Sequence, residues 1–207
     1  EGHLVHLNNW IRQQHATYEN GVTPTFSGTG TGTIEWASTA GEVLQLHHHD
    51  FPLFAAGADI YCVNDPDTPY RKITNIADLL KDSTGASLNN KTYGIVFWGV
   101  VSEDEADCKI FCNLPSGSEG ANKASKVRED KNKEIDYSIP SDFTGTGFLI
   151  NRLVIENISS STWDLDLAGS GDDLRGTFPN TAAGSSVSVG TEFADDTFRI
   201  LDDADAT

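Results

Sequence analysis

Residues 91–101 read KTYGIVFWGVV, and this stretch decides the fold class. Large apolar side chains occupy both alternating sets of positions, namely Tyr93, Ile95 and Phe97 in one and Val96 and Trp98 in the other. Aromatic and β-branched residues favour a strand. A strand that is apolar on both faces is typical of a sheet covered on both sides. We therefore expect this segment to be the central strand of the core.

Further strands are expected on both sides of this segment. Cys108–Leu114 predicts a second buried strand, joined to the first by the acidic turn Ser102–Asp107. Thr146–Ile158 predicts another long strand, which turns into Thr162–Leu167, where apolar residues alternate with Asp164 and Asp166. A shorter strand is expected at Asp59–Val63.

The amino-terminal quarter is less regular. Gly2–Tyr18 shows no clear helical period, so we expect a strand, a turn and a strand there. Thr23–Thr33, rich in Gly and Thr, is expected to be a flexible or extended connection. The runs Thr33–Trp36 and Glu42–His49 flank the turn residues Ser38–Gly41, which predicts a hairpin.

Helix signals are few. Thr74 or Asn75 can cap a short helix over Ile76–Leu80, and Gly117–Glu134 reads as a solvated helix or a mobile excursion. The expected fold is mainly β: a β-sandwich or jelly-roll-like single domain with one or two short helices. We assign residues 1–190 to this domain and 191–207 to a carboxy-terminal strand or the start of a stem.

The charge balance excludes some partners. Thirty-one acidic against 14 basic residues leave a net charge of −17, which disfavours nucleic acid and anionic membranes. No apolar run is long enough for membrane insertion. Glu1 at the start and the lack of any Met indicate a cleaved product or an excised piece.

Cysteine usage does not indicate a metal motif. Cys62, Cys108 and Cys112 lack the paired spacing of zinc sites. On one strand, Cys108 and Cys112 would lie about 13 Å apart, beyond disulfide reach. A bridge from Cys62 to either is an alternative, but we expect three buried thiols.

The sharpest chemical feature is His47-His48-His49-Asp50. Residues two apart on a strand point the same way, so His47 and His49 could share a transition-metal ion. Three copies around a symmetry axis would complete an octahedral site. The alternative is that these are polar hairpin histidines that contact water or carboxylates.

Acidic clusters offer a second cation hypothesis, calcium, which takes six to eight oxygens. The carboxylates concerned are Asp164, Asp166, Asp172 and Asp173, and separately Asp195, Asp196, Asp202, Asp203 and Asp205. Neither cluster matches the spacing of a calcium loop, and the favoured interpretation is the solvated face of a strand.

Catalytic signatures are absent from the sequence. No Gly-x-Ser-x-Gly elbow occurs, and carboxylates for glycosidase chemistry cannot be selected among 31 acidic residues. We expect a protein without enzymatic activity. The loop Asn64–Tyr70 is expected to be exposed, and Asp65, Asp67 and Tyr70 are its candidates for contacting a ligand or receptor, with Tyr70 able to stack on a sugar.

Several phrases, in this order along the chain, resemble environmental bacteriophage and prophage proteins of the tail-fibre or virion-appendage kind. They are HHHDFP (47–52), VNDPDTPY (63–70), VFWGVV (96–101), NLPSG (113–117), IPSDFTGTGFLI (139–150), DLRGTFP (173–179) and FRILDDADAT (198–207). The resemblance implies a structural protein of a virion or the extracellular space. By fold-level analogy it also implies a homotrimer that contacts other virion proteins and a host-surface glycan. The alternatives are a secreted carbohydrate-binding or adhesion module and, third, a polysaccharide hydrolase.

Overall fold

The computed structural model describes residues 2–11, 14–28, 32–120, 123–129, 138–159, 162–165, 171–177 and 180–181. Within these ranges the chain is mainly β with two short α-helices, α1 (His3–Ile11) and α2 (Ala124–Glu129), which confirms the expected fold class. None of the helices in the described ranges has the length and apolar character needed to cross a membrane.

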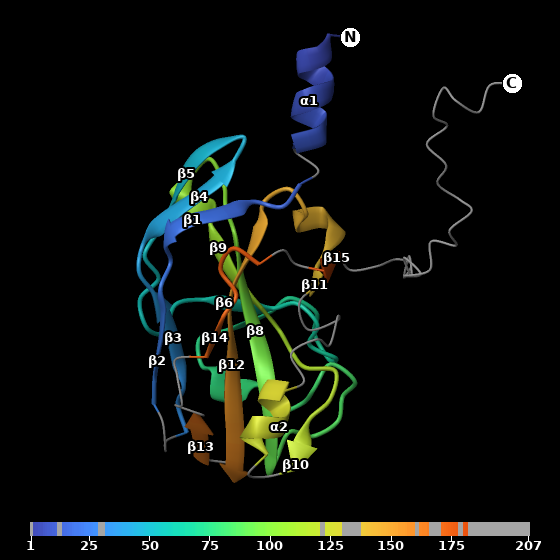
Figure 1. Ribbon diagram of the computed structural model, residues 1–207. Coiled ribbons are helices and arrows are strands. Elements are labelled where there is room, and N and C mark those ends of the chain that lie inside the picture. Colours follow the sequence, from blue (N-terminus) through green and yellow to red (C-terminus); the bar gives the residue numbers. More distant parts are fainter. Residues whose placement is uncertain are drawn as a thin grey trace, which may run out of the picture.

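One large sheet forms the first layer. Its strand order is β13-β12-β8-β9-β6-β7, with β10 beside β8 and β14 beside β12, and only the β6–β9 pair is parallel. The strands are β6 (Ile60–Cys62), β7 (Arg71–Ile73), β8 (Lys91–Val100), β9 (Lys109–Asn113), β10 (Glu119–Gly120), β12 (Gly147–Ser159), β13 (Thr162–Leu165) and β14 (Asp172–Asp173). The longest strands, β8 and β12, lie side by side at its centre (Figure 1).

The second layer consists of two small sheets that lie together beside the large one (Figure 1). One has the order β1-β4-β5 and the other pairs β2 with β3. These strands are β1 (Thr17–Gly21), β2 (Pro24–Ser27), β3 (Glu35–Ser38), β4 (Gly41–Gln45) and β5 (His47–Phe51). A fourth sheet pairs β11 (Ser138–Ile139) with β15 (Asn180–Thr181) in parallel and is separate from the others.

The main core lies between the two layers, where aromatic side chains meet across the gap. The Trp36 and Phe97 rings stack with centroids 5.9 Å apart, and Phe51 meets Phe148 edge-on at 5.0 Å. All four side chains are at most 2% exposed. This interdigitation of two inner faces makes the chain a β-sandwich.

A second apolar cluster covers the opposite face of the large sheet. It contains Val96, Trp98, Phe111, Ile139, Leu149 and Leu174. Because successive side chains of a strand alternate between faces, β8 sends Ile95 and Phe97 into the main core and Val96 and Trp98 into this cluster. The predicted central strand, apolar on both faces, is confirmed.

Other sequence-based expectations are also confirmed. Strands β8 and β9 pair antiparallel across the acidic turn, which contains the 3₁₀ helix η2 (Glu105–Asp107). Asn75 caps η1 (Ile76–Asp78), its side chain accepting a hydrogen bond from the Ala77 amide. A further 3₁₀ helix is η4 (Ser141–Phe143). Residues 182–207, which include the expected carboxy-terminal strand, lie outside the described residues.

The expected strand at the amino terminus is wrong, because His3–Ile11 forms helix α1. A strand needs a neighbour to satisfy its backbone amides, whereas a helix bonds them internally. Figure 1 shows α1 standing away from both layers, and none of the described strands lies beside it. Its Leu4, Leu7 and Trp10 side chains are exposed.

The predicted hairpin between Thr33–Trp36 and Glu42–His49 is also wrong. Strand β3 pairs with β2, and β4 pairs with β5 across a tight turn at Leu46. Leu46 has a φ of +66°, a conformation that Gly or Asn usually signals, and a leucine at this position does not indicate a turn. The expected linker Thr23–Thr33 likewise contains β2, which pairs with β3 over Pro24–Ser27.

Three free, buried thiols are present, as expected. Contact with the Cys62 thiol and burial raise the pKa of Cys112 well above its ordinary value, and burial raises the pKa of Cys108. Since the thiolate is the reactive form, both features suppress reactivity.

We expect DTNB to react slowly with the native chain and with three thiols after unfolding in guanidinium. An exposed thiol introduced by Ala56→Cys is the matched control and should add one rapid equivalent. Rapid reaction of the native thiols, or fewer than three after unfolding without reductant, would contradict the prediction.

Candidate metal centre

Strand β5 brings the two predicted ligands together. His47 and His49 lie two apart on one strand and therefore on one face. Their ring centroids are 4.1 Å apart, with the planes inclined by 28°. His49 is 7% exposed, whereas the His47 side chain is 58% exposed. The pair thus has one anchored ring and one open ring.

Glu103 joins the pair from the loop after β8. Its Oε1 lies 3.2 Å from His47 Nε2, and one donor atom from each of His47, His49 and Glu103 fits within a mutual distance of 4.8 Å. Glu103 was not among the predicted ligands because it is 56 residues from His47. The sequence shows the acidic turn, but it does not indicate which of the carboxylates in that turn lies beside the histidines.

Backbone carbonyls orient both imidazoles. His47 Nδ1 lies 2.9 Å from the His48 carbonyl oxygen, and His49 Nε2 lies 3.1 Å from that of Gln45. A carbonyl can only accept, so in each ring this nitrogen carries the proton and donates. In the neutral rings, the lone pairs of His47 Nε2 and His49 Nδ1 are left for a metal.

The His47 imidazole also binds its second proton more tightly than an ordinary histidine does. Hydrogen bonds to the His48 carbonyl and the Glu103 carboxylate raise the pKa of His47 above its ordinary value. A metal must displace this proton. Metal affinity at this site should therefore be full above the raised pKa and fall as the pH drops through it.

The loop that carries Glu103 is held in place by its own contacts. Asp104 caps η2 by accepting a hydrogen bond from the Ala106 amide at 3.0 Å. The Ser102 amide donates to Cys108 Sγ at 3.4 Å, which closes the loop. Beside Glu103 is a wide-open hollow lined by Pro52, Glu103, Asp104, Glu105 and Ala106.

The donor set suits a transition metal. Imidazole and carboxylate ligands hold zinc and its neighbours at about 2.0–2.2 Å, which places donors about 3–4 Å apart. His47 Nε2 and Glu103 Oε1, 3.2 Å apart, already lie at such a separation. Three protein donors leave at least one coordination position open toward solvent, since the Glu103 side chain is 79% exposed.

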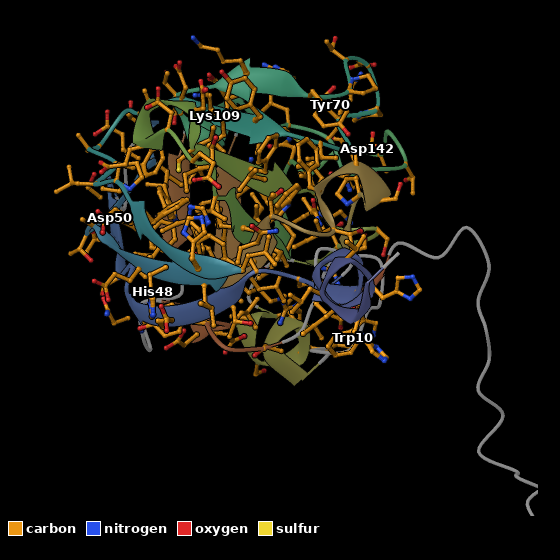
Figure 2. All side chains as sticks on the ribbon, turned by 90° about the horizontal axis from the view of Figure 1, so that it is seen from above. Trp10, His48, Asp50, Tyr70, Lys109 and Asp142 are labelled. Atoms are coloured by element: carbon orange, nitrogen blue, oxygen red, sulfur yellow. The ribbon has the colours of Figure 1, made fainter. Side chains whose placement is uncertain are left out.

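His48 takes no part in this group. It contacts the Glu19 carboxylate through Nδ1, and its side chain lies on the outside of the molecule beside β5, as does Asp50 (Figure 2). The alternation along β5 thus separates His48 from His47 and His49.

The acidic residues considered for calcium are engaged elsewhere or lie outside the described residues. Asp172 forms an ion pair with Arg152, and Asp173 forms one with Arg175 at 2.8 Å. Asp166 and residues 195–205 are outside the described ranges, and the Asp164 side chain is not described. Within the described part of the chain, only the group His47, His49 and Glu103 brings three donors together.

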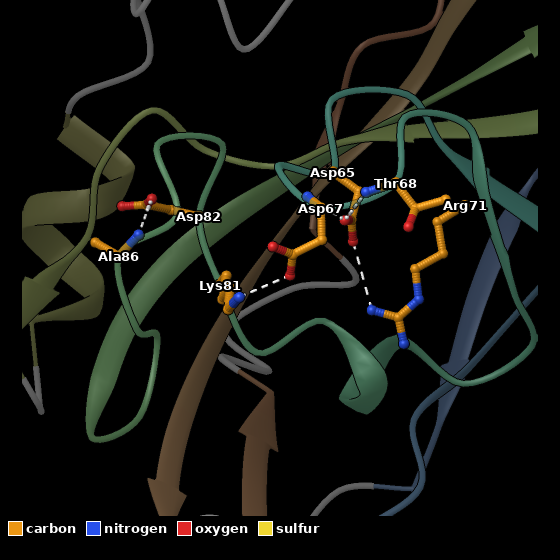
Figure 3. A network of polar contacts seen from close by, with 7 residues as sticks. All are labelled: Asp65, Asp67, Thr68, Arg71, Lys81, Asp82 and Ala86. Atoms are coloured by element: carbon orange, nitrogen blue, oxygen red, sulfur yellow. Dashed lines mark hydrogen bonds and ion pairs between the residues drawn. The ribbon is translucent and has the colours of Figure 1, made fainter.

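The predicted receptor loop is ordered by its own carboxylates (Figure 3). Asp65 is 6% exposed, and its Oδ1 accepts hydrogen bonds from the amides of Asp67 and Thr68. Burial alone would raise the pKa of Asp65, but these amides and the Arg71 guanidinium together hold that pKa below its usual value. Asp65 therefore shapes the loop, whereas Asp67 and Tyr70 lie at its surface. Their contact with a ligand stays a prediction.

Comparison of the chain with protein-family models, with curated proteins and with solved structures found no match.

Proposed function

We propose that this chain is a non-enzymatic structural protein of a virion appendage or similar extracellular assembly. In this proposal, a transition-metal ion bound by His47, His49 and Glu103 joins neighbouring copies. The observation that carries it is the convergence of three donor side chains, of which those of His47 and Glu103 are more than half exposed.

The exposure of the site favours a metal-bridged contact between copies over a catalytic centre. Catalytic metals lie in shaped cavities that exclude water, whereas His47 and Glu103 are more than half exposed. A donor from a second copy can reach the open positions without any rearrangement of the core. The trimer expected from the resemblance would be one such arrangement.

The net negative charge of the chain supports a requirement for a cation at such a contact. Copies that each carry a net charge of −17 repel one another at low ionic strength. A divalent ion between facing carboxylates and imidazoles offsets part of this repulsion where the surfaces meet. Assembly should therefore depend on the metal.

The test is the solution mass of the full chain by light scattering, with zinc or nickel and after chelation. We expect about one ion per chain and a discrete oligomer that dissociates in EDTA. His47→Ala removes one of three ligands, so it should weaken metal binding by more than the roughly 10–100-fold that loss of a hydrogen-bond partner behind a ligand costs, and it should leave a monomer.

His48→Ala is the matched control, because it removes a neighbouring histidine from the other face and should change neither metal binding nor mass. A chain without stoichiometric metal, or one whose mass ignores both EDTA and His47→Ala, would contradict the proposal.

A second candidate function is a secreted carbohydrate-binding or adhesion module. One observation favours it: Tyr70 presents a ring that is 43% exposed on a loop braced by Asp65.

A further inference from the structure

Tyr70 has an unfavourable backbone conformation. Its φ is +60°, in the left-handed region where Cβ crowds the backbone and glycine is preferred. Such outliers in bulky residues persist where the surroundings enforce them, often at ligand contacts. The neighbourhood of this ring is therefore a candidate binding surface.

Other aromatic side chains support the Tyr70 ring from one side. Its centroid lies 6.5 Å from that of Phe111 at 86°, and 6.4 Å from that of Phe143 at 60°. Phe111 in turn stacks on buried Trp98 at 4.5 Å. The ring is thus the outermost member of an aromatic row rooted in the core, and 43% of the residue remains exposed.

The loop that carries Tyr70 is braced by hydrogen bonds and ion pairs. Two amides donate to Asp65, the Arg71 guanidinium approaches its other oxygen at 3.4 Å, and Lys81 Nζ holds Asp67 at 2.7 Å (Figure 3). The Tyr70 amide itself donates to the Val63 carbonyl. A platform fixed in this way loses little entropy when a ligand binds.

Charged side chains lie on the segments next to the aromatic platform. Asp67, with a 66% exposed side chain, precedes Tyr70 on the same loop and forms an ion pair with Lys81. Asp142 is exposed and directly precedes Phe143 in η4, and Figure 2 places it on the same side of the molecule as Tyr70. An exposed ring flanked by a few carboxylates and an ammonium suits a ligand with one apolar face and a rim of hydroxyl groups.

We infer that Tyr70 is the stacking platform of a binding site for neutral pyranose sugars, and that Asp67, Lys81 and Asp142 supply the hydrogen bonds to the hydroxyl groups. The C–H face of a pyranose matches the exposed ring. The net charge of −17 and the local carboxylates select against uronic and sialic acids. This site uses none of the metal ligands; the inference rests on the second candidate function and names its class of ligand.

The experiment is saturation-transfer NMR on the full chain with methyl β-galactopyranoside, methyl β-glucopyranoside and sodium glucuronate, all in EDTA. Saturation should reach the ring C–H groups of at least one neutral glycoside and be weak for glucuronate. Because EDTA removes the metal, failure of the assembly proposal would leave this result unaffected. Binding that requires the metal, no transfer to either neutral glycoside, or preference for glucuronate would overturn the inference.

The decisive variant is Tyr70→Gly, because glycine adopts this φ without strain and should keep the loop folded. Tyr70→Gly should lower the affinity for the neutral sugar by about tenfold or more, as expected for loss of an aromatic anchor residue. Tyr70→Phe should retain binding. Trp10→Ala, which removes a ring that is 60% exposed on α1, is the matched control and should change nothing. Unaltered binding by a folded Tyr70→Gly variant would also overturn the inference.

Discussion

Replacement of Trp98 by alanine should lower the free energy of unfolding by about 3–5 kcal/mol, the range for truncating a large buried aromatic residue. Trp98 is fully buried and stacks on Phe111 with planes inclined by 16°. Its indole N–H donates to Asn113 Oδ1 at 3.0 Å, and Asn113 Nδ2 donates to the Ser138 carbonyl. The variant therefore loses packing and also removes a donor from a buried polar chain.

Urea denaturation checks this prediction through the transition midpoint at an unchanged slope. Trp98→Phe, which keeps a ring on Phe111 but lacks the N–H, should be less destabilised than Trp98→Ala. Trp10→Ala should stay within about 0.5 kcal/mol of the parent, since it lies on an exposed helix. Equal effects of Trp98→Ala and Trp10→Ala would contradict the placement of Trp98 in the core.

Replacement of Asp172 by alanine should lower the free energy of unfolding by about 3 kcal/mol, because it leaves a buried guanidinium without its counter-charge. The Arg152 side chain is 3% exposed, and its Nη1 lies 3.5 Å from Asp172 Oδ2 on the neighbouring strand β14. Its Nη2 donates to the Val127 carbonyl at 2.8 Å. Gly94 makes room for this side chain, since a Cβ there would lie 2.7 Å from Arg152 Nε.

Thermal and urea unfolding of two comparison variants separate charge from packing. Asp173→Ala, at the adjacent and exposed position, should cost less than about 1 kcal/mol. The double variant Arg152→Met/Asp172→Ala should be more stable than Asp172→Ala alone, because no unpaired charge remains buried. A double variant that is less stable than the single one would show that the guanidinium matters through its other contacts.

Much of the large sheet was predictable because its signals are local. The segment 91–101 is apolar on both faces, and the acidic turn after it leads directly into a second apolar run, so β8 and β9 followed from adjacent residues. The amino-terminal quarter was not predictable in this way. Helix α1 stands away from every strand in the described part of the chain, and the β4–β5 turn depends on an unfavourable φ at Leu46.

The candidate metal centre was likewise predictable from the sequence only in part. His47 and His49 were identified by their spacing of two, and they share a face in the structure although the hairpin expected around them is wrong. The face is the same because positions 43, 45, 47 and 49 remain on one side whether the chain continues or folds back at Leu46: Gln45 pairs with His47, and Val43 pairs with His49. This part of the prediction held because it depends only on the spacing of two residues along the strand, and not on which strands pair.

The sequence by itself determined the mainly-β class, the central strand, the two histidines and the acidic surface, since each depends on residues close together in the chain. Only the tertiary structure decided that Glu103 completes the histidine pair, that Asp65 shapes its loop, and that Tyr70 rests on Phe111 and Phe143. The contacts of Glu103 with His47 and of Tyr70 with Phe111 and Phe143 join residues separated by many positions, whereas those of Asp65 lie within its own loop. Which distant residues meet depends on how the two layers and their loops pack around the core. A local sequence pattern contains no information about that packing.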